Sequence, residues 1–294
     1  MNRAQNPDPG ASPEDRGRGP GRAGVPRTVA ARLARLACRW PIADAGEVEW
    51  LARACGNRGP TAYLPRARPD AAWVLHAMYV HESGPGGTTG DAHSSPHRMA
   101  GDHFLPDTGP PAGPADALVV GGRVGRTDRP GPEWHRLRWA EQCHRTGEPP
   151  VPEGLLPSLW CFTDLLQTGS WPPGIASPSE GSMDRDTWQR LTALLVRHGG
   201  GPDLRCLAYY SPMVLMGCER EHPHVREGLL GDASVLYDTP DTEFTPSNLW
   251  AEDRSWVLAT DCDLMATKVV GPPALIESLV TDGELEAVRL PWAH

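Results

Sequence analysis

The sequence contains almost no lysine: Lys268 is the only one among 28 basic residues, and the others are all arginine. Isoleucine, phenylalanine and asparagine are also scarce, with three, three and four residues in a chain of 294. These amino acids have AT-rich codons, so the bias indicates a GC-rich coding sequence. The abundance of arginine therefore does not by itself predict nucleic-acid binding.

Long apolar runs are missing as well. No segment approaches the roughly 18 to 20 consecutive apolar residues of a membrane helix. Arginines interrupt the only apolar segment near the N-terminus, so it lacks the apolar region of a secretory signal. We therefore expect a cytoplasmic protein with no membrane partner.

Seven cysteines are spread through the chain without a single C-x-x-C pair. Zinc ribbons and small disulfide-rich folds need closely spaced pairs of cysteines. We therefore expect reduced thiols that pack as small apolar side chains, and we predict no cofactor.

Glycine and proline, with 32 residues each, divide the chain into three parts. Residues 1–26 have few apolar side chains and are expected to be disordered, because they cannot bury enough surface to offset their ordering entropy. Residues 27–65 are expected to form a helical hairpin extension. Residues 66–294 are expected to form one domain with a long Gly/Pro/His-rich loop at 83–116.

The patterning of this domain predicts an α+β fold, a mainly antiparallel sheet with packed helices. Strands and helices do not alternate strictly, which disfavours a doubly wound parallel sheet. The chain closes as strand, strand, helix and strand, a β-β-α-β unit. The expected helices are 28–39, 44–56, 133–145, 184–197 and 272–280, and the expected strands are 117–120, 204–210, 233–237, 255–260, 264–270 and 285–290; the apolar run 71–80 is core of either kind.

The His-rich loop is one candidate metal site. Its imidazoles and carboxylates are of the type that zinc prefers. However, Pro96 breaks the helix that would place His93 and His97 on one face. We therefore predict a solvated loop without a metal, and keep a metal-assisted hydrolase as an alternative with Asp91, His93, His97 and His103 as ligands.

A second candidate is the turn with Asp261 and Asp263, which follows an apolar strand. Two carboxylates at a strand end can hold a divalent cation, as in nucleotide-sugar transferases. The alternating α/β pattern of such enzymes is missing upstream, and aspartate is also common in hairpin turns. A transferase therefore stays an alternative.

The segment from Thr245 to Trp256 is the most distinctive, since two tryptophans bracket a short charged turn. Tryptophan and arginine are frequent anchors of protein interfaces. Residues 236–294 carry 11 acidic and 3 basic side chains, a net charge of −8, which favours a basic protein partner and disfavours nucleic acid. The partner-binding candidates are Trp250, Asp253, Arg254, Asp261 and Asp263.

A helix pair within residues 28–55 would also fit a DNA-binding helix-turn-helix. Two short helices alone are a weak motif, so we do not favour nucleic acid as a partner.

Three segments resemble a family of actinobacterial proteins to which no activity is assigned. They are PDAAWVLHAMYVHESGPGGTT, CLAYYSP and SNLWAEDRSWVLATDCDLMATKVVGPPALIESLV. The resemblance covers about residue 66 to the C-terminus; a start codon placed too early would explain the unmatched residues before it. The closing strand–strand–helix–strand layout is also similar to toxin-immunity proteins of the SUKH type, which implies an acidic α+β module that neutralises another protein.

No complete catalytic signature is present, so the sequence favours a binding protein over an enzyme. The hypothesis is a protein-binding module, with the toxin-immunity type as one option. The alternative is a metal-assisted enzyme acting on a small molecule.

Overall fold

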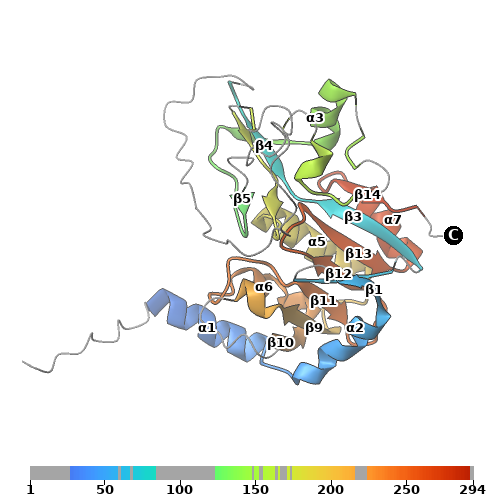
Figure 1. Ribbon diagram of the computed structural model, residues 1–294. Coiled ribbons are helices and arrows are strands. Elements are labelled where there is room, and N and C mark those ends of the chain that lie inside the picture. The colour runs from blue at the N-terminus through green and yellow to red at the C-terminus, as the bar shows by residue number, and fades with distance from the viewer. Residues whose placement is uncertain are drawn as a thin grey trace, which may run out of the picture.

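A computed structural model describes most of the chain from residue 27 to residue 291 (Figure 1). The expected disordered segment 1–26, the expected strand 117–120 and the loop 83–116, apart from its first residue, lie outside the described part. The described residues are 27–58, 61–66, 69–83, 123–147, 149–151, 155–162, 165, 171–172, 174–215 and 224–291.

A seven-stranded sheet forms the centre of the molecule, in the order β10-β9-β11-β12-β13-β3-β14. Every neighbouring pair in it is antiparallel, which confirms the predicted fold class. Its strands are β3 (Asp70–Leu75), β9 (Arg205–Tyr210), β10 (His224–Leu229), β11 (Asn248–Ala251), β12 (Val257–Thr260), β13 (Ala266–Gly271) and β14 (Ala287–Arg289).

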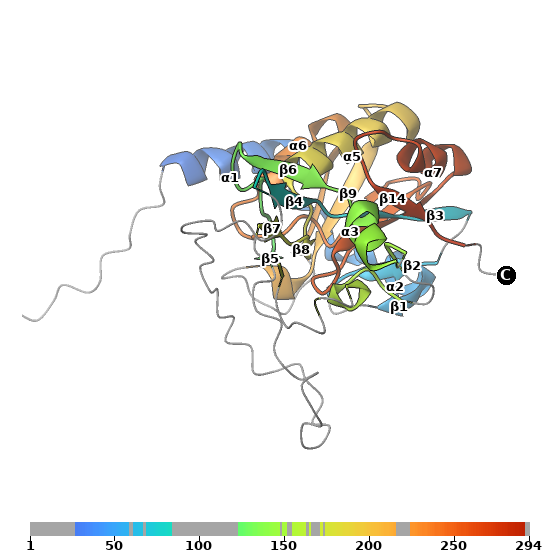
Figure 2. The ribbon, with the colours of Figure 1, turned by 90° about the horizontal axis from the view of Figure 1, so that it is seen from above.

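Helices cover one face of this sheet (Figure 2). Strand residues such as Ala72, Val74 and Leu258 point to this face and join the largest apolar core. The predicted helix over 184–197 is confirmed, because Asp184 caps its first turn and the helix ends before Gly199. The covering helices are α1 (Arg27–Arg39), α5 (Arg185–His198), α6 (Ser234–Tyr237) and α7 (Pro273–Val280).

The opposite face is covered by smaller elements, since alternate strand residues such as Trp73 and Leu75 point there. A three-stranded sheet with α3 covers one half, and α2 with a hairpin covers the other. These elements are η1 (Ala45–Val48), α2 (Glu49–Ala54), β1 (Cys55–Arg58), β2 (Tyr63–Pro65), β4 (Met78–His81), β6 (Trp134–Leu137), α3 (Trp139–Thr146) and β7 (Ile175–Ala176). The remaining elements are β5 (Arg123–Val124), η3 (Leu159–Cys161), β8 (Ser179–Glu180), η4 (Pro212–Val214) and η5 (Leu230–Asp232).

Two predicted elements are wrong. The helix expected over 133–145 begins only at Trp139, because residues 134–137 pair with β4 as strand β6. The strand expected over 233–237 is the short helix α6, whose own Leu236 and Tyr237 are buried. Short apolar runs fit both periodicities, so tertiary pairing decides between them.

Residues 27–65 contain the two expected helical elements and, in addition, the hairpin of β1 and β2. This segment belongs to the main packing, since Leu36 and Trp40 are buried in the largest core. Between the helices, Ile42 forms an isolated antiparallel bridge with Arg226 at the β10 edge.

The apolar run 71–80 is divided into β3 and β4 at His76, whose ring is fully buried. Its Nδ1 donates to the Ser179 carbonyl at 2.6 Å, so the neutral ring accepts at Nε2 from the Thr267 hydroxyl at 3.1 Å. Burial lowers the pKa of His76 to about 4, from an ordinary value of 6.5. The histidine is therefore neutral in the folded protein and links β3 to β8 and β13.

This buried histidine predicts a loss of stability in acid. Between pH 6.5 and 4 the unfolded chain binds a proton at His76 that the folded chain does not. The free energy of unfolding should therefore fall by about 3 kcal/mol as the pH falls through this range. Urea titrations at several pH values should show this dependence in the wild type. In His76→Gln the slope of the unfolding free energy against pH should be smaller, by the amount that corresponds to about one proton. Equal slopes in the two proteins would contradict the assignment.

Candidate functional site

Trp250 lies in the middle of β11, and its side chain is only 1% exposed. It packs edge-on against Trp50 of α2, with ring centroids 6.0 Å apart. This contact fixes α2 to the sheet, so Trp250 acts here as a core residue beneath the surface.

The turn between β11 and β12 presents Asp253 and Arg254 to solvent. The Arg254 amide donates to the Ala251 carbonyl at 2.8 Å, and the Ser255 amide donates to the Asp253 carboxylate at 3.0 Å. Arg254 has φ 62°, the one positive φ among the non-glycine residues that the structure describes. Glycine or asparagine is the usual residue at such a position.

The Arg254 guanidinium lies over the ring of Trp50, 4.9 Å from its centroid. Next to it, the exposed Glu252 forms an ion pair with Arg205 at 3.2 Å, and Arg205 also pairs with Glu227 at 2.9 Å. Exposed pairs of this kind add little stability. We call this group the Trp50–Arg254 surface; it comprises Trp50, Arg205, Glu227, Glu252, Asp253 and Arg254.

Asp261 lies at the other end of β12 and is buried. Its Oδ2 accepts from the amides of Thr61 and Ala62, both at 2.8 Å, and from the Thr61 hydroxyl at 3.3 Å. Its Oδ1 accepts from the Asp263 amide at 3.3 Å. The carboxylate therefore holds the chain before β2 against the turn between β12 and β13.

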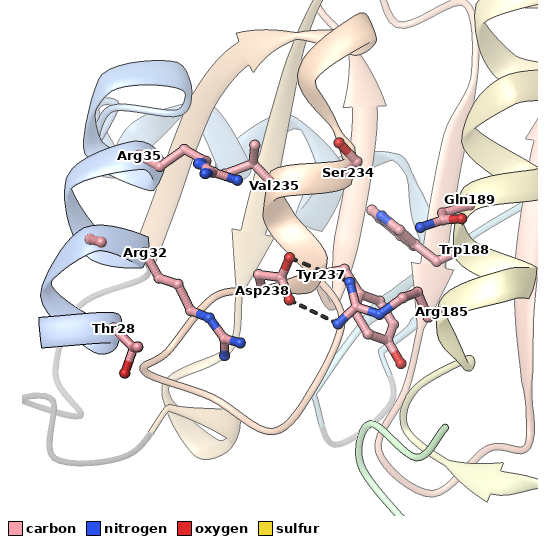
Figure 3. Close-up of a pocket in the computed structure, with 11 residues that line it drawn as sticks. Thr28, Arg32, Arg35, Arg185, Trp188, Gln189, Ser234, Val235, Tyr237 and Asp238 are labelled. Atoms are coloured by element: carbon pink, nitrogen blue, oxygen red, sulfur yellow. Dashed lines mark hydrogen bonds and ion pairs between the residues drawn. The ribbon is translucent and has the colours of Figure 1, made fainter. Parts of the chain in front are cut away.

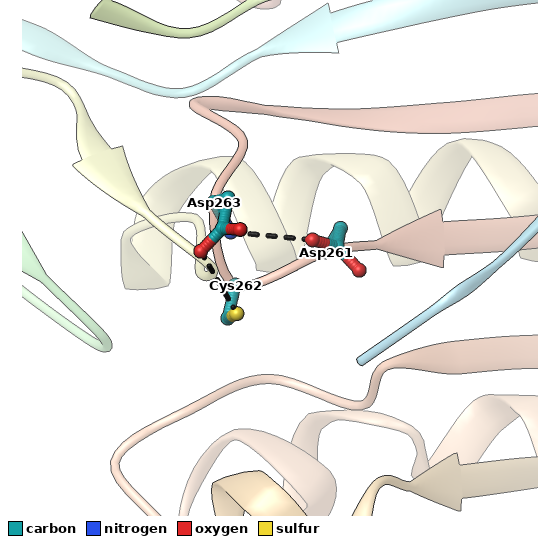
Figure 4. Close-up of side chains that lie close together, drawn as sticks. All are labelled: Asp261, Cys262 and Asp263. Atoms are coloured by element: carbon teal, nitrogen blue, oxygen red, sulfur yellow. Dashed lines mark hydrogen bonds between the residues drawn. The ribbon is translucent and has the colours of Figure 1, made fainter. Parts of the chain in front are cut away.

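Possible metal ligands meet at this turn, since one ligand atom from each of Asp261, Cys262 and Asp263 lies within 4.8 Å of the others (Figure 4). Burial raises the pKa of the Cys262 thiol to about 12, with the Asp263 carboxylate, which accepts from its Sγ at 3.2 Å, adding to the shift. The thiol is thus protonated, and Asp261 is committed to its hydrogen bonds. Asp263 is the one of the three with exposed carboxylate oxygens.

Glu180 of β8 was not predicted from the sequence, where it stands alone between serine and glycine. Burial, and then the charge of Asp263, raise its pKa to about 7. Gly181 allows the end of β8 to lie close to the turn between β12 and β13. Its φ is 74°, and a Cβ there would lie 2.6 Å from the Phe244 ring and 2.9 Å from the Cys262 Cα. Glu180 is thus a half-buried carboxyl group, whereas Asp263 is an exposed one.

The five predicted partner-binding residues therefore do not share one surface. The turn with Asp253 and Arg254 precedes β12, whereas Asp261 and Asp263 follow it, so the two groups lie at opposite ends of that strand. The alternative metal ligands Asp91, His93, His97 and His103 lie outside the described residues.

Comparison of the chain with protein-family models, with curated proteins and with solved structures finds no match. Within the described part of the chain, the helices are too short or too polar to cross a membrane.

The hydrogen bonds at the turn predict different roles for its two aspartates. Asp261→Asn removes the negative charge of a buried side chain and replaces one of its acceptor oxygens with an NH2 donor that faces a backbone amide. The substitution should therefore lower the free energy of unfolding by about 2 to 4 kcal/mol. Asp263→Asn, at an exposed carboxylate, should change it by less than about 0.5 kcal/mol. Chemical denaturation of both variants tests this, and similar losses in the two would contradict it.

Glu180 predicts a stability term of opposite sign to that of His76. Its raised pKa means that the folded protein binds more protons than the unfolded chain between pH 4.5 and 7. This term is present below pH 4.5 and is lost as the pH rises through 7. The midpoint of thermal unfolding should therefore fall more between pH 5 and pH 8 in the wild type than in Glu180→Gln. The exposed Glu243→Gln is the control and should behave as the wild type does; a Glu180→Gln profile identical to the wild type would refute the assignment.

Proposed function

We propose that the protein is a protein-binding module and that the Trp50–Arg254 surface is its contact surface. The observation that carries the proposal is the conformation of Arg254, an arginine at a left-handed turn position with its guanidinium on an aromatic ring. Non-glycine residues at such positions are strained by about 1 to 3 kcal/mol and gather at functional sites.

The contact chemistry of this surface supports the proposal. The Trp50 ring and the Arg254 guanidinium form a preorganised pair of the residue types that dominate interface energetics. The pair rests on the buried Trp250, so little side-chain freedom remains to be lost on binding.

Charge supports a basic partner. The whole chain has a formal net charge of −9, and residues 236–294 alone contribute −8. The Trp50–Arg254 surface holds three acidic residues, Glu227, Glu252 and Asp253, against two basic ones, Arg205 and Arg254. Such a surface attracts a cationic protein and repels phosphate backbones. A toxin-immunity role is one form of this function, and the captured partner would identify it.

The decisive variant is Arg254→Gly. Glycine accepts the positive φ, so the relief of strain offsets the lost ring contact, and the unfolding free energy should stay within about 1 kcal/mol of the wild type. Binding should nevertheless weaken by about tenfold or more. The full chain is used as bait in native lysate at low salt, and the affinity of the purified retained protein is then measured for each variant.

Two further variants sharpen this experiment. Asp253→Asn should lower the affinity for a basic partner because a negative charge is lost. Arg197→Gln, at an exposed position of α5 on the other side of the sheet, should leave the affinity unchanged. A partner held equally by the wild type and Arg254→Gly would show that this surface is not the contact. The absence of any basic protein in near-stoichiometric amount would count against a binding module altogether.

The metal-assisted hydrolase or transferase stays the alternative prediction. The observation that favours it is the turn at which one ligand atom from each of Asp261, Cys262 and Asp263 lies within 4.8 Å of the others, because carboxylates are ligands for hard cations. Metal analysis of the purified chain tests it. Stoichiometric manganese or zinc that disappears in Asp261→Asn and Asp263→Asn would favour the enzyme, and metal content below stoichiometry after incubation with both ions would count against it.

A further inference from the structure

A cavity of about 510 Å³ opens between α1, α5 and α6 (Figure 3). These helices pack on the face of the sheet opposite to the one that Trp50 covers. The size of the cavity falls within the roughly 300 to 1,000 Å³ of small-molecule sites. None of its lining residues belongs to the Trp50–Arg254 surface or to the Asp261–Asp263 turn. Arg32 and Arg35 line it from α1, Arg185 and Gln189 from α5, and Val235 and Tyr237 from α6.

One of its three arginines is already neutralised. Arg185 donates to both carboxylate oxygens of Asp238, the shorter contact being 2.9 Å, and its guanidinium lies over the Tyr237 ring at 4.4 Å. The hydrogen bond from Arg185 holds the pKa of Asp238 below its usual value, so the carboxylate is ionised and the pair is fixed. Arg185 thus forms a rigid wall of the cavity.

The other two arginines have no hydrogen-bonded acidic partner among the described residues, although the charge of Arg32 contributes to the lowered pKa of Asp238. Arg32 and Arg35 are exposed, and neither forms a hydrogen bond or a close ion pair with any residue that the structure describes. They stand three residues apart and extend from the same side of α1 toward α6 (Figure 3). Like charges at this spacing repel each other within a helix. With three arginines and one aspartate, the cavity has a surplus of two positive charges in a chain of net charge −9.

We propose that this cavity binds a small organic oxyanion with at least two negative charges, either a phosphate ester or a polycarboxylate. Arg32 and Arg35 would bind the anionic group, since guanidinium matches both chemistries with paired hydrogen bonds. The remainder of the ligand would rest on the apolar surface of Ala31 and Val235, with Gln189 as a neutral donor. An oxyanion between the two arginines would also remove their repulsion.

Calorimetric titration of the full chain at low ionic strength tests the proposal, with inorganic pyrophosphate and citrate as separate probes. At least one probe should bind with a stoichiometry of one. Arg32→Gln and Arg35→Gln should each weaken that binding by about tenfold, the value of one charge-assisted hydrogen bond. Arg197→Gln, at an exposed arginine of α5 that does not line the cavity, is the matched control and should leave it unchanged.

A second pair of variants separates a cavity from a merely basic surface. Ala31→Trp fills the cavity while both arginines remain, and it should abolish binding. Ala34→Trp, at an exposed position of the same helix that does not line the cavity, should retain it. Binding of pyrophosphate alone would assign a phosphate ligand, and binding of citrate alone a carboxylate. If neither probe binds, if Arg197→Gln weakens binding as much as Arg32→Gln does, or if Ala31→Trp retains binding, the cavity is not an anion site and the proposal is wrong.

Discussion

The structure depends on one constraint: both faces of the central sheet are apolar, so both must be covered. Alternate residues of β3 point to opposite cores, with Val74 in one and Trp73 in the other. Helices cover the first face, and short elements from several separate parts of the chain cover the second. Each covering piece needs its own attachment, and Trp50 on Trp250, the Asp261 hydrogen bonds and the buried His76 are such attachments.

Elements with strong local signals could be predicted from the sequence. Helix α5 has a capping aspartate, a leucine stripe and a terminal glycine within one segment, and the closing β-β-α-β unit has turns between its strands. Residues 134–137 could not be predicted in this way, because their strand exists only through pairing with β4. Helix α6 likewise depends on the core that it packs against, since an apolar run of that length fits a strand equally well.

The candidate site was predictable in part. The turn with Asp253 and Arg254 is visible as a charged segment between two tryptophans, but Trp50 comes from a distant part of the sequence and has no local signal there. Asp261 looked like a metal ligand next to Asp263, whereas its Oδ2 accepts from amides of a segment far upstream and its Oδ1 accepts from the Asp263 amide. The environment of Glu180 depends on the fold, because the Gly181 amide, which donates to the Leu264 carbonyl at 2.9 Å, places β8 beside the turn after β12. Chemistry that depends on long-range contacts is therefore the part that local patterns miss.

The bridge between Ile42 and Arg226 has a consequence for how copies of the chain meet. A sheet ends in strands with unpaired backbone groups, and these can recruit a strand from another molecule. At the β10 edge, residues 41–43 occupy those groups, with the Glu227 amide donating to the Pro41 carbonyl at 3.0 Å and the Ala43 amide to the Val225 carbonyl at 2.9 Å. The other edge, β14, is only three residues long and ends in Arg289. Neither end of the sheet offers a long apolar edge, so the sheet is protected against strand-by-strand self-association.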